Sequence, residues 1–126
     1  MLIIFLGILE GMVDGSFWGH LDRLVSECRI IVDNPRGTHD GGSDTIVFPV
    51  DYGYLEGTSS MDGEGIDVFV GSDPRDMIDA IVCTVDLVKM DSEIKVLIGC
   101  TEEEKQAILR FYESFPQNRP LLVRRD

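Results

Sequence analysis

The sequence is divided into many short β-like runs that are separated by glycine, proline and aspartate. Each run is rich in Val, Ile, Phe or Tyr, the residues that favour the pleated, half-buried surface of a sheet. The Asp-, Gly- and Pro-rich stretches between them are typical of turns and end each strand after a few residues. The strand-like runs are residues 29–32, 45–48, 52–56, 66–70, 78–88, 93–98 and 121–123.

Two helix signals flank these runs. Ser16 can cap a helix whose apolar residues recur at helical spacing over residues 17–28. Residues 101–104 have the spacing of a capping box, and the helix that they begin runs toward Ser114 before Pro116 ends it. Short strands with a helix near each end predict a mainly β fold with flanking helices (α+β), as a small β-barrel or a strongly twisted sheet.

The length of 126 residues fits one domain, which we expect to span residues 1–126. Residues 1–15 form an apolar extension, and the barrel with its helices occupies residues 16–126. The run 1–9 resembles the apolar part of a signal peptide, but it lacks a basic flank and is too short to span a bilayer. We therefore expect it to lie against a partner subunit and not in a membrane.

The formal charge of −12 argues against nucleic acid as a partner, because nucleic-acid-binding proteins need a basic face. The acidic residues are spread along the whole chain and do not form a tail. Cys28, Cys83 and Cys100 have no CxxC spacing, which favours buried thiols in a reducing cytoplasm over a zinc site. The sequence also offers no plausible His-Asp support for a serine or cysteine nucleophile, so covalent catalysis is not expected.

Asp62, Glu64 and Asp67 form a dense group of carboxylates, interleaved with two glycines and followed by a strand. Acids this close together repel one another unless a cation lies between them. Carboxylates without sulfur ligands suit hard cations such as Mg²⁺, Mn²⁺ or Ca²⁺. Because Asp and Gly are also standard turn residues, an exposed acidic turn is the simpler interpretation of the triplet taken alone.

The segments around this triplet resemble motifs of the soluble family I inorganic pyrophosphatases. The run Phe-Pro-Val-Asp-Tyr-Gly-Tyr at 48–54 is similar to the family's Tyr-Pro-x-Asn-Tyr-Gly-Tyr segment, and 62–67 is similar to its Asp-x-Asp-x-x-Asp signature. Residues 89–95 resemble a shortened form of its Lys-Met-x-Asp…Asp-x-Lys hairpin. The resemblance covers residues 30–97 and, more loosely, the helix after Thr101.

This resemblance implies a five-stranded β-barrel related in shape to the OB-fold, with the two acidic segments meeting at one end. It also implies Mg²⁺-dependent hydrolysis of inorganic pyrophosphate or a related phosphoanhydride by a metal-activated water, with Mn²⁺ as an alternative ion. The expected form is a homo-oligomer in the cytoplasm. The implied metal ligands are the carboxylates of Asp62, Glu64, Asp67, Asp91 and Glu93.

The resemblance also implies catalytic roles for four side chains. Glu64 stands where the family has its general base, and Asp67 is the last acid of the signature. Lys95 matches a lysine that contacts phosphate, and Tyr52 matches a tyrosine at the phosphate site. Glu64 is one methylene longer than the usual Asp, which matters because small displacements of a catalytic group are costly.

Several positions depart from the family pattern. Phe48 replaces the tyrosine before proline, Phe115 and Pro116 replace a Tyr-Lys pair, and residues 37–44 lack the expected basic residues. Each charged hydrogen bond to phosphate that is lost costs about 1.5–3 kcal/mol. Two alternatives follow. One is a catalytically degenerate protein that acts as a metal- or phosphate-binding or regulatory module, and the other is a hydrolase of a bulkier phosphate ester.

Overall fold

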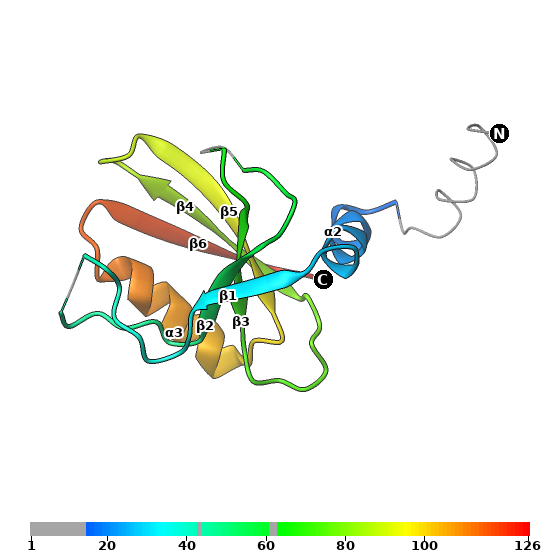
Figure 1. The fold of residues 1–126 in the computed structure, drawn as a ribbon, viewed down its shortest axis with the longest axis horizontal. Coiled ribbons are helices and arrows are strands. Elements are labelled where there is room, and N and C mark those ends of the chain that lie inside the picture. The colour runs from blue at the N-terminus through cyan, green and yellow to red at the C-terminus, as the bar shows by residue number, and fades with distance from the viewer. Residues whose placement is uncertain (1–14, 43, 61–62) are drawn as a thin grey trace.

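The structure, a computed structural model, describes residues 15–42, 44–60 and 63–126. Figure 1 shows a sheet with one helix on each side of it. The helices are α2 (Phe17–Ser26) and α3 (Glu102–Glu113). The strands are β1 (Ile30–Asn34), β2 (Asp51–Leu55), β3 (Ile66–Val70), β4 (Ala80–Asp86), β5 (Asp91–Ile98) and β6 (Asn118–Arg124).

The strands form one sheet in the order β1-β2-β3-β5-β4-β6. All neighbouring pairs are antiparallel except β3 and β5, which run parallel. The expected mainly β fold with flanking helices is confirmed, but the described sheet has six strands and does not close into a five-stranded barrel. The reason is that β6 pairs along the whole of β4 and occupies the edge that closure onto β1 would require.

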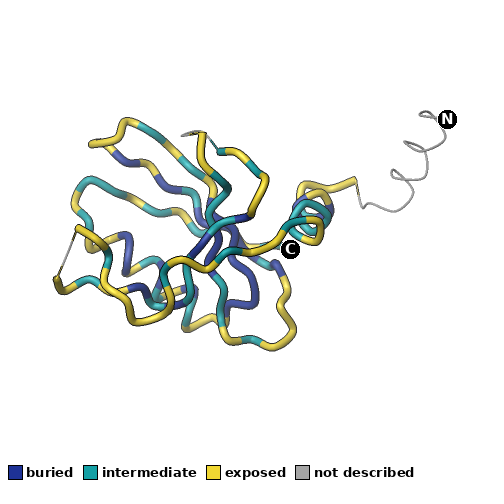
Figure 2. The backbone as a smooth tube through the Cα atoms, viewed as in Figure 1, coloured by how far each residue is buried: buried dark blue, intermediate teal, exposed yellow. Residues whose placement is uncertain are grey.

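The core lies in two layers, one on each face of the sheet. Because side chains alternate along a strand, Phe69 and Leu97 point to the face that α3 covers, whereas Val68 and Val96 point to the face that α2 covers. These four side chains are completely buried, and Figure 2 shows the buried backbone concentrated where the central strands cross. Each layer therefore fixes one helix on the sheet.

Both predicted helix caps are confirmed. The Ser16 side chain accepts a hydrogen bond from the backbone N–H of Gly19, and Thr101 and Glu104 form a complete capping box. No described helix is both long and apolar enough to cross a membrane. The apolar run 1–9 lies outside the described residues.

Residues 45–48 were predicted to form a strand, and this prediction is wrong. The segment makes only an isolated bridge between His39 and Val47. Its backbone hydrogen bonds go to residues 37–40, within a loop that folds back on itself and joins no neighbouring strand of the sheet. The side chain of Phe48 nevertheless enters the core beside α3.

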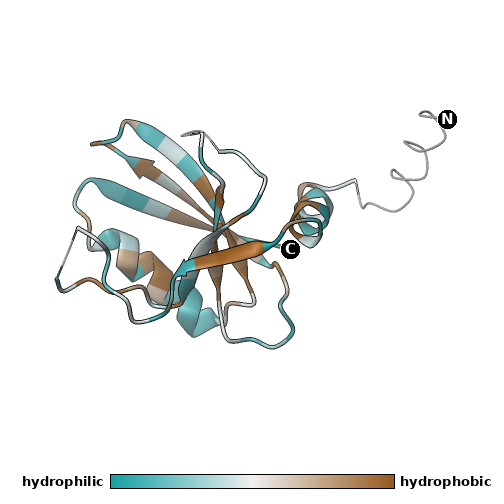
Figure 3. Ribbon diagram, viewed as in Figure 1, coloured by the Kyte–Doolittle hydropathy of each residue, from teal (hydrophilic) through white to brown (hydrophobic). Residues whose placement is uncertain are grey.

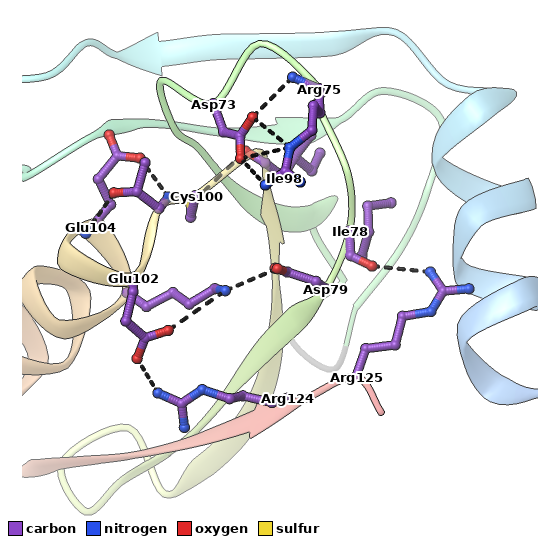
Figure 4. Close-up of polar contacts among 12 residues, drawn as sticks. Asp73, Arg75, Ile78, Asp79, Ile98, Cys100, Glu102, Glu104, Arg124 and Arg125 are labelled. Atoms are coloured by element: carbon purple, nitrogen blue, oxygen red, sulfur yellow. Dashed lines mark hydrogen bonds and ion pairs between the residues drawn. The ribbon is translucent and has the colours of Figure 1, made fainter.

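Polar contacts anchor the first turn of α3, as Figure 4 shows. The ammonium of Lys105 lies 3.0 Å from the Asp79 carboxylate, and Glu102 pairs with Arg124 of β6. Glu104 accepts hydrogen bonds from the backbone N–H groups of Ser72 and Thr101. These contacts set the direction of α3, so that its last turns pass over the sheet face described below.

Gly53 lies in the middle of β2, opposite Val32 of β1. A Cβ atom at this position would collide with the backbone carbonyl of Ile31. We predict that Gly53→Ala lowers the free energy of unfolding by about 1–3 kcal/mol, because β1 must move away from β2. Urea denaturation measures the effect. Gly41→Ala is the control, since nothing lies within 4 Å of its Cβ position; equal stability of the two variants would contradict this account of β1–β2 packing.

Candidate functional site

A buried lysine forms the centre of the site. Lys95 lies on β5, and its side chain is only 6% exposed. Its ammonium group donates hydrogen bonds to the Asp67 carboxylate at 2.8 Å, the Glu93 carboxylate at 2.7 Å and the Tyr52 hydroxyl at 3.2 Å. A buried ammonium is tolerated only when its charge is paired and its N–H groups are bonded, and these three partners meet both needs.

The strand register brings these partners together. In the parallel pair, Val68 lies opposite Val96, so Asp67 and Lys95 are neighbours one position earlier on each strand. Glu93 precedes Lys95 by two residues on β5 and therefore shares its face. In the antiparallel pair, Tyr52 lies opposite Phe69 of β3. Three strands thus each supply a side chain to one point on the α3 face.

The surroundings keep Lys95 charged and the neighbouring phenols neutral. Burial alone would lower the pKa of the Lys95 ammonium, but the facing Tyr112, Tyr52 and Asp67 raise it by more, so that the net shift is upward. Burial is also the main cause of the raised pKa of Tyr52 and of Tyr112. The site therefore contains a fixed cation beside two hydroxyl groups that retain their protons.

A first cavity of about 440 Å³ opens on one side of Lys95, and we name it the carboxylate cavity. Four carboxylates and two lysines give its wall a formal charge of −2. Its lining residues are Asp33, Tyr52, Tyr54, Glu64, Gly65, Asp67, Lys89, Glu93 and Lys95. An anion would be repelled from such a wall unless a cation were bound with it.

A second cavity of about 230 Å³ lies on the other side of Lys95, next to α3 and the β4–β5 hairpin, and we name it the aromatic cavity. It shares Tyr52, Lys89, Glu93 and Lys95 with the carboxylate cavity. Its other lining residues are Asp40, Phe48, Thr84, Asp86, Asp91, Phe111, Tyr112, Phe115, Gln117 and Asn118. The two cavities are therefore neighbouring halves of one polar site.

The structure gathers most of the side chains that the sequence selected. Tyr52, Glu64, Asp67, Glu93 and Lys95 all line the carboxylate cavity. A sixth, Asp91, lies opposite Asp86 next to the turn of the β4–β5 hairpin and lines the aromatic cavity. A seventh, Asp62, lies outside the described residues. Within the part of the chain that the structure describes, no three His, Cys, Asp or Glu side chains group closely enough to hold a metal ion.

Tyr54 and Tyr112 were not selected from the sequence. Tyr54 lines the carboxylate cavity, and its spacing of two from Tyr52 on the same strand was the signal that could have found it. The ring of Tyr112 lies 5.8 Å from the Lys95 ammonium. No local pattern links that helix position to β5, because the contact depends on how α3 packs on the sheet.

Two solved bacterial structures have a similar fold. One is an inorganic phosphatase from Anaplasma phagocytophilum, with a TM-score of 0.54, and the other is an inorganic pyrophosphatase from Helicobacter pylori, with a TM-score of 0.52. Each is 13% identical over 75% of this chain and 81% of the other chain. At this identity the similarity shows the fold alone. No curated protein matches the sequence.

The sequence itself identifies the family. The family model for Inorganic Pyrophosphatase matches residues 25–122, which is most of the chain. The protein therefore belongs to the inorganic pyrophosphatase family, as the resemblance of its motifs predicted.

The Lys95 cluster gives a test by double mutation. We predict that Lys95→Met lowers the free energy of unfolding by roughly 2–4 kcal/mol, because it leaves Asp67 and Glu93 without their shared cation. Adding Glu93→Gln to Lys95→Met should cost less than the two single losses combined, with an interaction of about 1–3 kcal/mol. Denaturant titration of the four proteins measures this cycle.

Lys89→Met is the matched control, because Lys89 lines both cavities but is exposed. Its stability should stay within about 0.5 kcal/mol of the parent. If the stability losses of Lys95→Met and Glu93→Gln simply add in the double variant, the two charges do not stabilise each other.

Proposed function

We propose that this chain hydrolyses inorganic pyrophosphate or a related phosphoanhydride, with Mg²⁺ or Mn²⁺ bound in the carboxylate cavity. Membership of the inorganic pyrophosphatase family supports the reaction class. The observation that carries the proposal is the charged Lys95 held by Asp67, Glu93 and Tyr52 at the wall between two polar cavities.

The donor set fits a hard divalent cation. The carboxylate cavity offers oxygen ligands only, and its formal charge of −2 would be balanced by one divalent ion. Glu64, Asp67 and Glu93 do not group closely enough to hold an ion as they stand, so they would have to move together around it. Asp62 from the adjoining segment and Asp91 from the other cavity would complete the ligand set. When bound, the metal would screen the phosphate charges and lower the pKa of a water molecule.

The protein's own side chains would orient the anion. All three N–H donors of Lys95 are already used, so a phosphate oxygen can bind its ammonium only by replacing one partner. The Tyr52 hydroxyl, the neutral and most distant acceptor at 3.2 Å, is the partner most easily replaced. Because the pKa of Tyr52 is raised, its hydroxyl keeps its proton, and turning this O–H away from Asp67 would let it donate to the same anion. Glu64, an exposed residue that lines the carboxylate cavity, would accept a proton from the attacking water.

The direct test is phosphate release from pyrophosphate with and without Mg²⁺. We predict release that requires the metal and falls about a hundredfold in Asp67→Asn, because this change weakens both the metal site and the pairing of Lys95. Asp44→Asn is the matched control; its carboxylate is exposed and lines neither cavity. Equal rates for Asp67→Asn and the parent would remove Asp67 from the mechanism.

Absence of phosphate release from the parent protein would refute hydrolysis of this substrate. Calorimetric titration with Mg²⁺ then separates the remaining alternatives. Heat of binding that disappears in Asp67→Asn but persists in Asp44→Asn would support a non-catalytic metal-binding module. No binding at all would refute the metal site as well.

We also propose that the protein is a cytoplasmic homo-oligomer. Exposed apolar side chains lie on the sheet face that α2 only partly covers. Val85, Ile94, Leu121 and Val123 gather on the neighbouring strands β4, β5 and β6, and Ile30 and Val32 lie at the opposite edge, on β1. Figure 3 shows that most of the β1 ribbon consists of hydrophobic residues. Sedimentation velocity should therefore give a species larger than the monomer at micromolar concentration, whereas a stable monomer would contradict this proposal.

A further inference from the structure

The aromatic cavity has the composition of a site for an organic ring. The rings of Phe48 and Tyr52 are stacked with centroids 4.9 Å apart, and Phe48 stacks on Phe111 at 5.0 Å. Phe115 meets Phe111 edge to face at 5.4 Å and extends this aromatic wall along α3 and beyond its end. Gln117 and Asn118, which follow α3, add amide groups to the lining. Five aromatic residues thus line one part of the cavity, and nine polar or charged residues line the rest.

The same cavity is poorly suited to a second free phosphate. Asp40, Asp86, Asp91 and Glu93 outnumber the two lysines, so the lining carries a formal charge of −2 and, like the carboxylate cavity, would repel an anion unless a cation were bound with it. Where the resemblance led us to expect a Tyr-Lys pair, the chain has Phe115 and Pro116. An aromatic ring therefore lines the cavity beside the place where a phosphate-binding cation was expected.

A buried polar atom also lacks a partner here. The Asn118 side-chain Oδ1 is inaccessible to solvent, and no group in the described residues donates a hydrogen bond to it. An unsatisfied buried acceptor costs free energy, and a ligand donor in the cavity would recover it once the Asn118 amide rotates to expose Oδ1. An exocyclic amino group of a purine is such a donor, and asparagine and glutamine side chains recognise adenine in this way.

We propose that the aromatic cavity binds the base of a nucleoside diphosphate whose phosphates lie at Lys95 and in the carboxylate cavity. This inference rests on the proposed function and names its substrate class. The volume of about 230 Å³ is below the roughly 300–1,000 Å³ of sites for drug-sized ligands, so it accommodates one ring system and leaves the diphosphate outside. The wall shared by the two cavities lets one ligand reach both.

The reaction is a hydrolysis of the phosphoanhydride. One water oxygen bonds to the terminal phosphorus, the bond from that phosphorus to the bridging oxygen breaks, and the bridging oxygen stays on the nucleoside monophosphate. The products are the monophosphate and inorganic phosphate, and one proton passes to solvent. No oxidant or further reactant is needed.

The test compares adenosine diphosphate with inorganic pyrophosphate as substrates, both with Mg²⁺. We expect a higher kcat/KM for adenosine diphosphate than for pyrophosphate. Phe115→Ala should lower the kcat/KM for adenosine diphosphate about tenfold and keep that for pyrophosphate within twofold of the parent value, because only the nucleotide loses a stacking partner. Leu122→Ala is the matched control, since Leu122 packs on the same core but does not line the cavity. Phe115→Lys should shift the preference toward pyrophosphate.

Binding of the non-hydrolysable α,β-methylene analogue of adenosine diphosphate, measured by calorimetry, keeps this test independent of catalysis. If pyrophosphate is hydrolysed but the analogue does not bind, or binds equally to Phe115→Ala, the base site is refuted and the proposed function remains. If neither substrate is hydrolysed but the analogue binds and Phe115→Ala weakens it, hydrolysis is refuted and the base site remains. Equal affinity for the corresponding inosine diphosphate analogue, which lacks the amino group, would refute the Asn118 contact.

Discussion

The pairing of the buried Lys95 ammonium is the constraint on which the rest of the site depends. Removing a lysine charge from water costs several kcal/mol, and the cost is offset only by close, well-oriented partners. Here the partners come from three strands, Asp67 on β3, Glu93 on β5 and Tyr52 on β2. The pairing of Lys95 therefore depends on the register of the central sheet. A one-residue shift of β3 would turn Asp67 to the opposite face and a similar shift of β2 would turn Tyr52, while Glu93, on the same strand as Lys95, would stay beside it.

The helix α3 completes this arrangement from above. Its first turn is fixed by ion pairs to the loop before β4 and to β6, and its capping box closes the N-terminus. Its last turns then place Phe111 and Tyr112 over the sheet, where Tyr112 faces Lys95. The helix thus covers the core and forms part of the wall of the aromatic cavity. The contacts that hold the first turn of α3 therefore also determine the shape of the site at its last turns.

Local chemistry made much of the fold predictable. The strand at 66–70 and the cap at Thr101 follow from composition and spacing within a few residues, and both are confirmed with the expected bounds. Residues 45–48 have an equally good strand composition, but they make only an isolated bridge, to His39. A β-prone run becomes a strand only if another strand, often distant in sequence, pairs with it. The composition of the run does not show whether such a partner is available. The open sheet has the same origin, because it depends on β6 pairing with β4.

The candidate site was predictable to the extent that motifs encode it. Tyr52, Asp67, Glu93 and Lys95, which the motifs selected, lie together in one cavity. They did not show that Lys95 bonds to all three others, because that follows from the parallel pairing of β3 with β5. They also treated Asp91 as a member of one acidic cage, whereas the hairpin places it in the second cavity. The motifs thus select residues that lie close together, and the strand register decides how these residues divide between the two cavities.

The wall that separates the two cavities has a thermodynamic consequence. Glu93 and Lys95 belong to both, so a ligand that draws on either group in one cavity changes the potential felt in the other. By linkage, this effect is reciprocal. If a ligand in one cavity changes the affinity of the second cavity for its own ligand by some factor, the second ligand changes the affinity for the first by the same factor. A cation that competes with Lys95 for Glu93 would free an N–H donor for an anion, which gives the coupling a positive sign. The two halves of this small site are, in that sense, each other's effectors.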